Sequence, residues 1–156
     1  MTSRIEPLPS HAAVPIAMLH GACFPEDPWD ADAIDRIMHI PGFFGRVGWV
    51  KEDLIGFALA IALGEEAEVV SLGVLPGHRR CGTGFALLDA ICAEAWSRGA
   101  RRVVLEVAPD NEGARALYAR RGFTIIGRRR NYYRRTEGLV NALILAVPLP
   151  TFPLAT

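Results

Sequence analysis

The fold is decided by residues 73–99, which read GVLPGHRRCGTGFALLDAICAEAWSRG. The stretch begins as the end of an apolar run typical of a strand, and Pro76-Gly77 ends that run. Its second half predicts a helix over 85–98, because apolar residues recur there at helical spacing. These residues are Leu88, Ile91, Cys92 and Ala95. A turn rich in arginine and glycine, residues 79–84, therefore joins a strand to a helix.

A glycine turn in front of a helix is suited to binding phosphate. The first N–H groups of a helix have no partner inside it and lie at the positive end of its dipole. Gly82 and Gly84 allow a ligand to approach the backbone, and the two arginines add positive charge. The turn is not a P-loop, because Thr83 stands where that motif needs lysine. It is not a dinucleotide fingerprint either, because Leu87 stands at the third glycine position. A plain turn with solvated arginines stays open as the alternative.

Apolar runs and turn residues outside this stretch predict the remaining elements. Strands are predicted over 4–8, 44–50, 54–63, 68–75, 102–107, 123–127 and 139–147. Further helices are predicted over 11–23, over 30–39, and from Asp110 or Asn111 to Arg121. This order of strands and helices predicts a mixed α/β fold, with helices on the faces of one mixed sheet.

Composition is that of an ordinary globular protein. The chain has 156 residues, 51% of them hydrophobic and 22% charged, so it can bury a core within one domain. We expect that domain over 1–148 and a short tail over 149–156. Net charge is zero, which does not favour nucleic acid or an anionic membrane, and residues 57–63 are too short an apolar run to span one. Without a signal peptide, a CxxC pair or metal-ligand spacing of histidines, we expect a cytoplasmic protein that binds no metal.

Five segments, in order along the chain, resemble the GCN5-related N-acetyltransferase (GNAT) superfamily. They are GVLP at 73–76, RRCGTG at 79–84, LEVAPDN at 105–111, ALYARRGF at 116–123 and RRNYY at 129–133. The second is similar to the family's pyrophosphate loop, [QR]-x-x-G-x-[GA]. The last is similar to a segment of the ribosomal-protein alanine N-acetyltransferases, the RimI-like subfamily. The resemblance implies a GNAT-type domain with a twisted, mostly antiparallel sheet of about seven strands.

The resemblance further implies that acetyl-CoA binds along the glycine turn. It assigns the pantetheine arm to the backbone of Leu72, Gly73 and Val74, and it assigns a cofactor contact to Asn111. The pyrophosphate is assigned to Arg79, Arg80, Cys81, Gly82, Thr83, Gly84 and Phe85. Phe85 departs from the family, because relatives often have a basic or small polar residue at this position.

By the same resemblance, Glu106 is the general base and Tyr118 the general acid. An amine is protonated at neutral pH, so a carboxylate must take its proton before the amine can attack a thioester. A phenol can then protonate the thiolate that leaves. From the residues alone, Glu106 in an apolar strand is as typical of an ion pair with an arginine. Tyr118 likewise fits the buried face of a helix.

The acceptor side is assigned by resemblance to Asn131, Tyr132 and Tyr133. The implied acceptor is the N-terminal amine of a peptide or protein, such as the alanine of a ribosomal protein. Relatives continue with an acidic E-D-A, where this chain has Val140-Asn141-Ala142, so a small-molecule amine is an alternative acceptor. A non-catalytic acetyl-CoA-binding module and an RNA-binding domain built on the arginines of 128–135 are further alternatives. We expect no nucleic-acid or membrane partner, and either a monomer or a homodimer.

Overall fold

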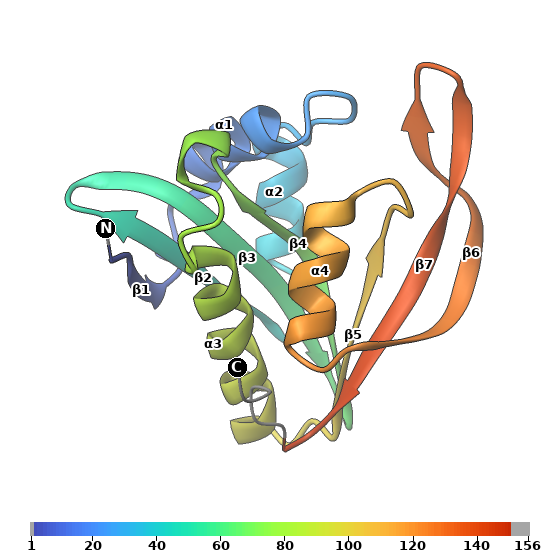
Figure 1. The fold of residues 1–156 in the computed structure, drawn as a ribbon. Coiled ribbons are helices and arrows are strands. Elements are labelled where there is room, and N and C mark those ends of the chain that lie inside the picture. Colours follow the sequence, from blue (N-terminus) through green and yellow to red (C-terminus); the bar gives the residue numbers. More distant parts are fainter. Residues whose placement is uncertain (1, 151–156) are drawn as a thin grey trace.

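The computed structural model describes residues 2–150, apart from the side chain of Arg134. Its strands form one sheet in the order β1-β2-β3-β4-β5-β7-β6 (Figure 1). They are β1 Arg4–Pro7, β2 Phe43–Val50, β3 Asp53–Leu63, β4 Glu66–Val74, β5 Arg102–Val107, β6 Thr124–Arg135 and β7 Gly138–Pro148. The β4–β5 pair is parallel and the other described pairs are antiparallel, which confirms the predicted mixed, mostly antiparallel sheet.

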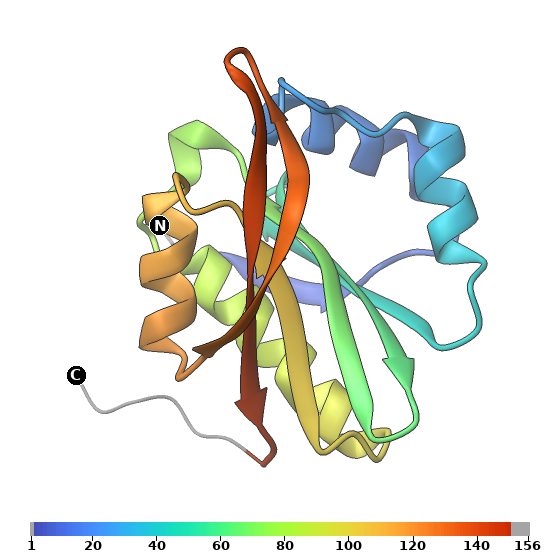
Figure 2. The same cartoon turned by 90° about the vertical axis from the view of Figure 1, so that its right-hand side faces the viewer.

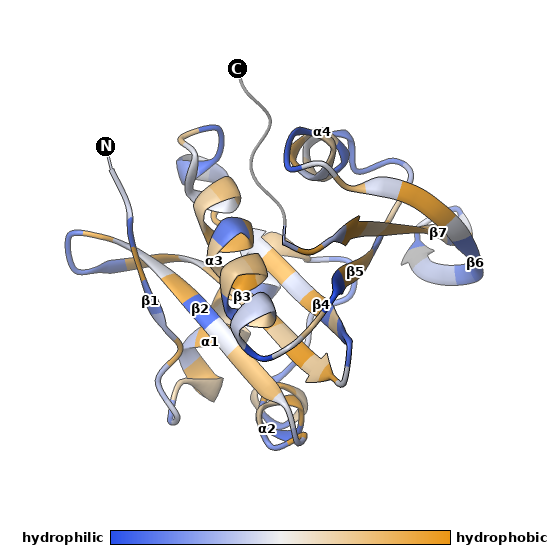
Figure 3. Cartoon of the chain, turned by 90° about the horizontal axis from the view of Figure 1, so that it is seen from below, coloured by the Kyte–Doolittle hydropathy of each residue, from blue (hydrophilic) through white to orange (hydrophobic). Residues whose placement is uncertain are grey.

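Helices cover both faces of the sheet (Figure 2). They are α1 Ala13–Cys23 and α2 Ala31–Met38 on one face, and α3 Thr83–Ser97 and α4 Glu112–Arg120 on the other, with the short helix η1 Pro76–His78 after β4. β3 packs against the helices on both faces of the sheet, because successive side chains of a strand point to opposite faces. Ala58 and Ala60 belong to the core with α3, whereas Phe57 and Leu59 belong to the core with α1 and α2. The central strands are mostly hydrophobic, whereas the outer part of β6 is hydrophilic (Figure 3).

Side chains cap the beginnings of two helices, and the cap at Asn111 is one of the two that the sequence predicts for its helix. Asp30 Oδ1 accepts a hydrogen bond from the N–H of Ala33 at the start of α2, at 2.8 Å. Asn111 Oδ1 accepts from the N–H of Ala114 at the start of α4, at 3.2 Å. α3 begins at Thr83, two residues earlier than predicted, so Gly84 lies in the helix and not in the turn.

The hairpin of β6 and β7 is longer than predicted. The expectation of a strand ending at Gly127 is wrong, because β6 continues to Arg135. The added part pairs with β7 and reaches beyond the other strands (Figure 1). Residues 128–132 are exposed, so the apolar alternation by which a strand is predicted is missing there.

The chain leaves the sheet at the end of β7. Leu149, expected in the tail, is buried at 8% exposure, and its N–H donates to the carbonyl of Arg101 at 2.8 Å. Residues 151–156 of that expected tail lie outside the described residues.

Candidate active site

β4 and β5 separate in the middle of the sheet. Their pairing runs from Glu66 with Arg102 to Val69 with Leu105, and it goes no further within the described chain. Residues 70–74 of β4 continue along β3 alone, and the two strands diverge toward the end where β4 meets α3 (Figure 1). The backbone of this segment, which includes the predicted Leu72, Gly73 and Val74, therefore has an edge to which an extended molecule can add as a strand.

The turn after β4 opens into α3 with free backbone donors. Gly82 has φ +85°, a conformation that favours glycine, and its carbonyl accepts from the N–H of Ala86 at 3.0 Å. The N–H groups of Thr83, Gly84 and Phe85 come before this first helical bond, so they have no partner inside the helix. Gly82 offers no side chain to cap them. The predicted pyrophosphate turn thus has the geometry by which helices bind phosphate.

The two arginines of the turn differ in their roles. Arg79 folds back on β4, where its Nε donates to the carbonyl of Val74 at 2.9 Å. Arg80 is exposed and has φ +64°, which is uncommon outside glycine and costs roughly 1–2 kcal/mol. Backbone strain of this kind concentrates at ligand sites. Arg79 therefore supports the turn, while Arg80 presents its charge at the surface beside the exposed Cys81.

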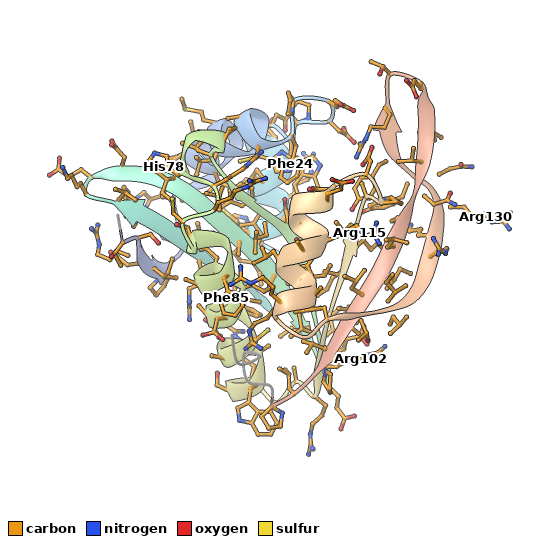
Figure 4. The ribbon with its side chains drawn as sticks, in the orientation of Figure 1. Phe24, His78, Phe85, Arg102, Arg115 and Arg130 are labelled. Atoms are coloured by element: carbon orange, nitrogen blue, oxygen red, sulfur yellow. The ribbon has the colours of Figure 1, made fainter. Side chains whose placement is uncertain are left out.

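A cation from α4 stands beside Phe85. The guanidinium carbon of Arg120 lies 5.2 Å from the centroid of the Phe85 ring, within cation–π range. Phe85 lies on the first turn of α3, next to the predicted pyrophosphate turn (Figure 4). By the resemblance, relatives often have a basic or small polar residue at the Phe85 position, and in this chain α4 brings a positive charge next to it. Sequence reasoning missed Arg120, because only the packing of α4 beside α3 brings the two residues together.

Glu106 is held through one of its two oxygens. It alternates along β5 with Leu105 and Val107, whose side chains belong to the core with α3, so its carboxylate lies on the other face. Oε1 accepts from Nη1 of Arg129 at 3.3 Å. Oε2 is buried and has no hydrogen-bond partner of good geometry among the described residues, while an interaction of the Tyr132 hydroxyl with the carboxylate contributes to raising the pKa of Tyr132. The ion pair that the sequence left open therefore exists, and it leaves one oxygen available to accept a proton.

Tyr118 is buried at 6% exposure, with its ring centroid 5.9 Å from that of Phe123. Burial raises the pKa of Tyr118 to about 12, so its phenol is protonated at neutral pH. Burial also raises the pKa of Tyr133, and the charges of Tyr132, Glu106 and Tyr118 add to that effect. These groups are therefore within electrostatic reach of one another. Core packing and proton donation both remain compatible with Tyr118.

An irregular pairing shapes the predicted acceptor side. Residues 130–132 of β6 lie opposite the single residue Asn141 of β7. Asn131 has φ +52°, and its N–H donates to Oδ1 of Asn141 at 3.0 Å. The rings of Tyr132 and Tyr133 lie edge to face, 4.8 Å apart. Asn141 therefore offers the acceptor oxygen that an aspartate would offer at this position, without the charge.

Arg135 joins three segments at this end of the molecule. Its Nε and Nη2 donate to the two carboxylate oxygens of Asp110, at 2.9 and 3.0 Å, and its Nε lies 3.7 Å from Oε2 of Glu26. Its guanidinium carbon lies 5.5 Å from the centroid of the Tyr133 ring. The hydrogen bonds from Arg135 lower the pKa of Asp110. β6 is thereby linked to the α1–α2 connection and to the turn at Asn111.

Metal ligands and membrane-spanning helices concern the other expectations. Among residues 2–150, no group of three or more His, Cys, Asp and Glu side chains is arranged to hold a metal ion. None of the described helices is long and apolar enough to cross a membrane.

Similarity to known proteins identifies the family. A sequence model described as the Acetyltransferase (GNAT) family matches residues 15–123. The chain belongs to the GNAT family. The resemblance seen in the sequence is thereby confirmed, and acetyl-CoA is the acetyl donor that this family uses.

Two curated relatives of this GNAT chain bear names of the predicted subfamily. The [ribosomal protein bS18]-alanine N-acetyltransferase of Escherichia coli is 38% identical over 96 residues. That alignment covers 62% of this chain and 65% of the relative, just under two thirds of the relative's length. The N-alpha-acetyltransferase RimI of Mycobacterium tuberculosis is 36% identical over 113 residues, which cover 70% of each chain.

A solved structure extends the similarity over almost the whole chain. The crystal structure of the ribosomal-protein-S18-alanine N-acetyltransferase from Escherichia coli superposes with a TM-score of 0.87 at 26% identity. It covers 99% of this chain and 97% of that one. The GNAT fold is therefore shared from the first strand to the last.

Proposed function

We propose that this GNAT chain, with residues 1–148 as its domain, is an acetyl-CoA-dependent N-acetyltransferase acting on the N-terminal α-amine of a protein. The observation that carries the proposal is the buried, unpaired Oε2 of Glu106, beside the point where β4 and β5 separate. Similarity to ribosomal-protein alanine acetyltransferases supports an alanine N-terminus of a ribosomal protein as the acceptor. An acceptor of that kind would place the reaction in the cytoplasm.

The proposed cofactor contacts follow from backbone geometry. The pantetheine arm adds to the edge of β4 at 72–74, and the pyrophosphate accepts from the N–H groups at the start of α3. Asn111 has its Oδ1 engaged as a helix cap, so its amide nitrogen is the atom left for the cofactor. Held in this way, the thioester lies near the separation of β4 and β5, within reach of a group on either face of the sheet.

The proposed reaction is a direct transfer in a ternary complex. Oε2 of Glu106 takes a proton from the acceptor ammonium, directly or through a water molecule. The neutral amine attacks the thioester carbonyl, the carbon–sulfur bond breaks, and the thiolate takes the proton of the Tyr118 phenol. The new amide nitrogen loses its second proton, which returns to the Tyr118 phenolate, and Glu106 releases its proton to solvent, so both residues regain their starting forms. An α-amine has a pKa of ~7.7–8.0 against ~10.4 for lysine, so one carboxylate is a sufficient base for an N-terminus.

A second candidate is transfer to a small-molecule amine. It is favoured by Val140 and Asn141, which leave the acceptor side without the acidic pair that relatives have there. Both candidates use Glu106 as the base, and they differ only in whether the amine belongs to a protein or to a small molecule.

Mass spectrometry after turnover with acetyl-CoA distinguishes the two. The acceptors are an Ala-starting peptide, the same peptide with a blocked N-terminus and an internal lysine, and the small amine spermidine. We expect the acetyl group on the free alanine N-terminus. Modification of the internal lysine alone, or turnover with spermidine alone, would reject the N-terminal acceptor. Because Lys51 is the only lysine of the chain, Lys51→Arg removes self-acetylation at a side chain as a source of signal.

A further inference from the structure

Arg129 connects the proposed base with the acceptor side. Its Nη1 donates to Oε1 of Glu106 at 3.3 Å, and its guanidinium carbon lies 4.2 Å from the centroid of the Tyr132 ring. The side chain is 57% exposed, while that of Glu106 is 20% exposed. Stacking on Tyr132 limits the positions of a long side chain that would otherwise move freely. The guanidinium is therefore held over one oxygen of the carboxylate and away from the other.

A second carboxylate lies on the same face of the sheet. Glu68 of β4 pairs with Val104, and Glu106 follows two residues further along β5, so both side chains point to one face. Burial raises the pKa of Glu68, as do the neighbouring charges of Glu106 and Glu66, while Arg129 lowers it. The titratable and charged groups around Glu106 are thus Glu68 on β4 and Arg129, Tyr132 and Tyr133 on β6. Glu66 acts on Glu68, and Tyr118 acts on Tyr133.

We propose that Arg129 is a positioning residue: it holds Oε1 of Glu106 and offsets the negative charge of Glu68, so that Oε2 takes the proton of the acceptor amine. The inference rests on the function proposed above. A merely structural ion pair would gain most by engaging both carboxylate oxygens, as Arg135 does with Asp110. Arg129 engages one oxygen and leaves the buried one unpaired, and unpaired buried acceptors are rare in folded proteins, where a catalytic role is one of their causes.

The two charges beside Glu106 act in opposite directions. A neighbouring cation favours the ionised form of a carboxylate, and a neighbouring anion disfavours it. Loss of the cation in Arg129→Gln should move the acid limb of the kcat/KM profile for the acceptor to higher pH. Loss of the anion in Glu68→Gln should move the same limb to lower pH. A loss of packing alone would lower the plateau of the profile and leave the limb in place.

The test measures kcat/KM against pH for the Ala-starting peptide, with each profile normalised to its own plateau. Solvent screens charges that are partly exposed, so we expect a measurable but limited displacement of the limb. On the acid limb, Arg129→Gln should therefore lose severalfold more activity than on the plateau. Arg129→Lys keeps the charge and should restore the limb, although it cannot reproduce the planar stack on Tyr132.

Arg130→Gln is the matched control. Arg130 is the next residue of β6, is exposed, and points away from the sheet (Figure 4), so its loss should leave the limb unmoved. Limbs that stay in place in both Arg129→Gln and Glu68→Gln, in variants that unfold like the wild type, would overturn the inference. If Arg129→Gln fails to fold, the shift of Glu68→Gln still decides. A wild-type chain that does not turn over acetyl-CoA would instead refute the proposed function itself.

Discussion

Glu106 lies in a run of apolar residues, where an ionised side chain costs free energy unless it has partners. The fold gives it one partner and leaves one buried oxygen unpaired. Glu106→Gln keeps the shape of the side chain and removes the proton acceptor. We expect kcat to fall by ~10²–10⁴-fold, which is the usual contribution of general base catalysis to the rate. Calorimetry should find the affinity for acetyl-CoA unchanged.

Glu66→Gln is the control for this experiment. Glu66 lies at the other end of the β4–β5 pairing, where it forms an ion pair with Arg102 at 2.7 Å. Both side chains of that pair are more than two fifths exposed, and such pairs contribute little, so kcat should stay near the wild-type value. Equal kcat in Glu106→Gln and Glu66→Gln would show that Glu106 has a structural role and is not the base.

Single residues could be assigned from the sequence only where a motif carries them. Glu106 and Tyr118 stand in such motifs, so they could be named before the fold was known. Arg129 also stands in a motif, yet its contact with Glu106 depends on β7 lying between β5 and β6. Arg120 stands in a motif as well, and its place beside Phe85 depends on the packing of α4. The motifs therefore predicted candidate functional residues, but they did not predict the contacts between those residues.

The glycine turn is the element on which cofactor binding is proposed to depend. Gly84 is a poor place to test it, because an added Cβ would lie 3.2 Å from Cδ2 of Leu117 and disturb the packing of α4. Cys81 is exposed, so Cys81→Asp adds a negative charge beside the proposed pyrophosphate without crowding. We expect weaker acetyl-CoA binding by calorimetry, with a loss that shrinks as salt is added.

Cys81→Ser is the neutral partner of that variant. It keeps the size of the side chain and adds no charge, so acetyl-CoA affinity should match the wild type. The comparison isolates the charge, because both variants remove the same thiol. Equal affinity of Cys81→Asp and Cys81→Ser for acetyl-CoA would place the pyrophosphate elsewhere.

The connection between α1 and α2 depends on a buried histidine. His20 is 3% exposed; its Nδ1 accepts from the N–H of Trp29 at 3.0 Å, and its ring stacks on Trp29 at 4.5 Å. Burial lowers the pKa of His20 from 6.5 to about 4, against an opposing effect of Asp27. The native state therefore binds fewer protons than the unfolded state between these values. Its stability falls as pH drops through this window, by up to about 3 kcal/mol from this residue.

Urea unfolding of wild type and His20→Gln at a series of pH values tests this dependence. Glutamine keeps an acceptor for the N–H of Trp29 and does not titrate. We expect the variant to be less stable than the wild type at pH 8, because the substitution removes the stacking on Trp29. The difference in free energy of unfolding between the two proteins should narrow as pH falls from 6.5 to 4. The exposed His11, changed to glutamine, should leave the profile unaltered. A difference between wild type and His20→Gln that does not vary with pH would contradict the assignment.

Element boundaries were predicted best where a core decides them. β5 was predicted with its observed bounds, because its apolar residues alternate into the core with α3. The second half of β6 was not predicted, because residues 128–135 form a projecting hairpin of polar residues. The irregular pairing opposite Asn141 lies in the same part, and only the three-dimensional pairing reveals it. The least predictable element is therefore the one that carries the proposed acceptor side.

For the molecule as a whole, the separation of β4 and β5 places the proposed cofactor binding and the proposed acceptor binding in two different parts. The part that ends in β4 and α3 offers backbone groups, which suits a cofactor common to the whole family. The part formed by β5, β6 and β7 offers side chains, which suits an acceptor that differs between relatives. The order of elements predicted one mixed sheet. It did not predict that the parallel pairing would stop after Val69, because hydrophobic periodicity does not report register.

The two parts are joined at the acceptor side by Arg135, which links the β6–β7 hairpin to the α1–α2 connection and to the turn at Asn111. Its ionic partners Asp110 and Glu26 are each more than half exposed, so the link is worth about 1 kcal/mol at most. We expect Arg135→Gln to raise KM for the Ala-starting peptide roughly fivefold, the equivalent of that free energy, with acetyl-CoA affinity unchanged. Hydrogen exchange should become faster in the hairpin and in residues 24–29, and stay as in the wild type in α3. Arg128→Gln removes the same charge from an exposed position of β6 and should alter neither measurement. A peptide KM that is equal in Arg135→Gln and Arg128→Gln would show that the hairpin orders the acceptor without this link.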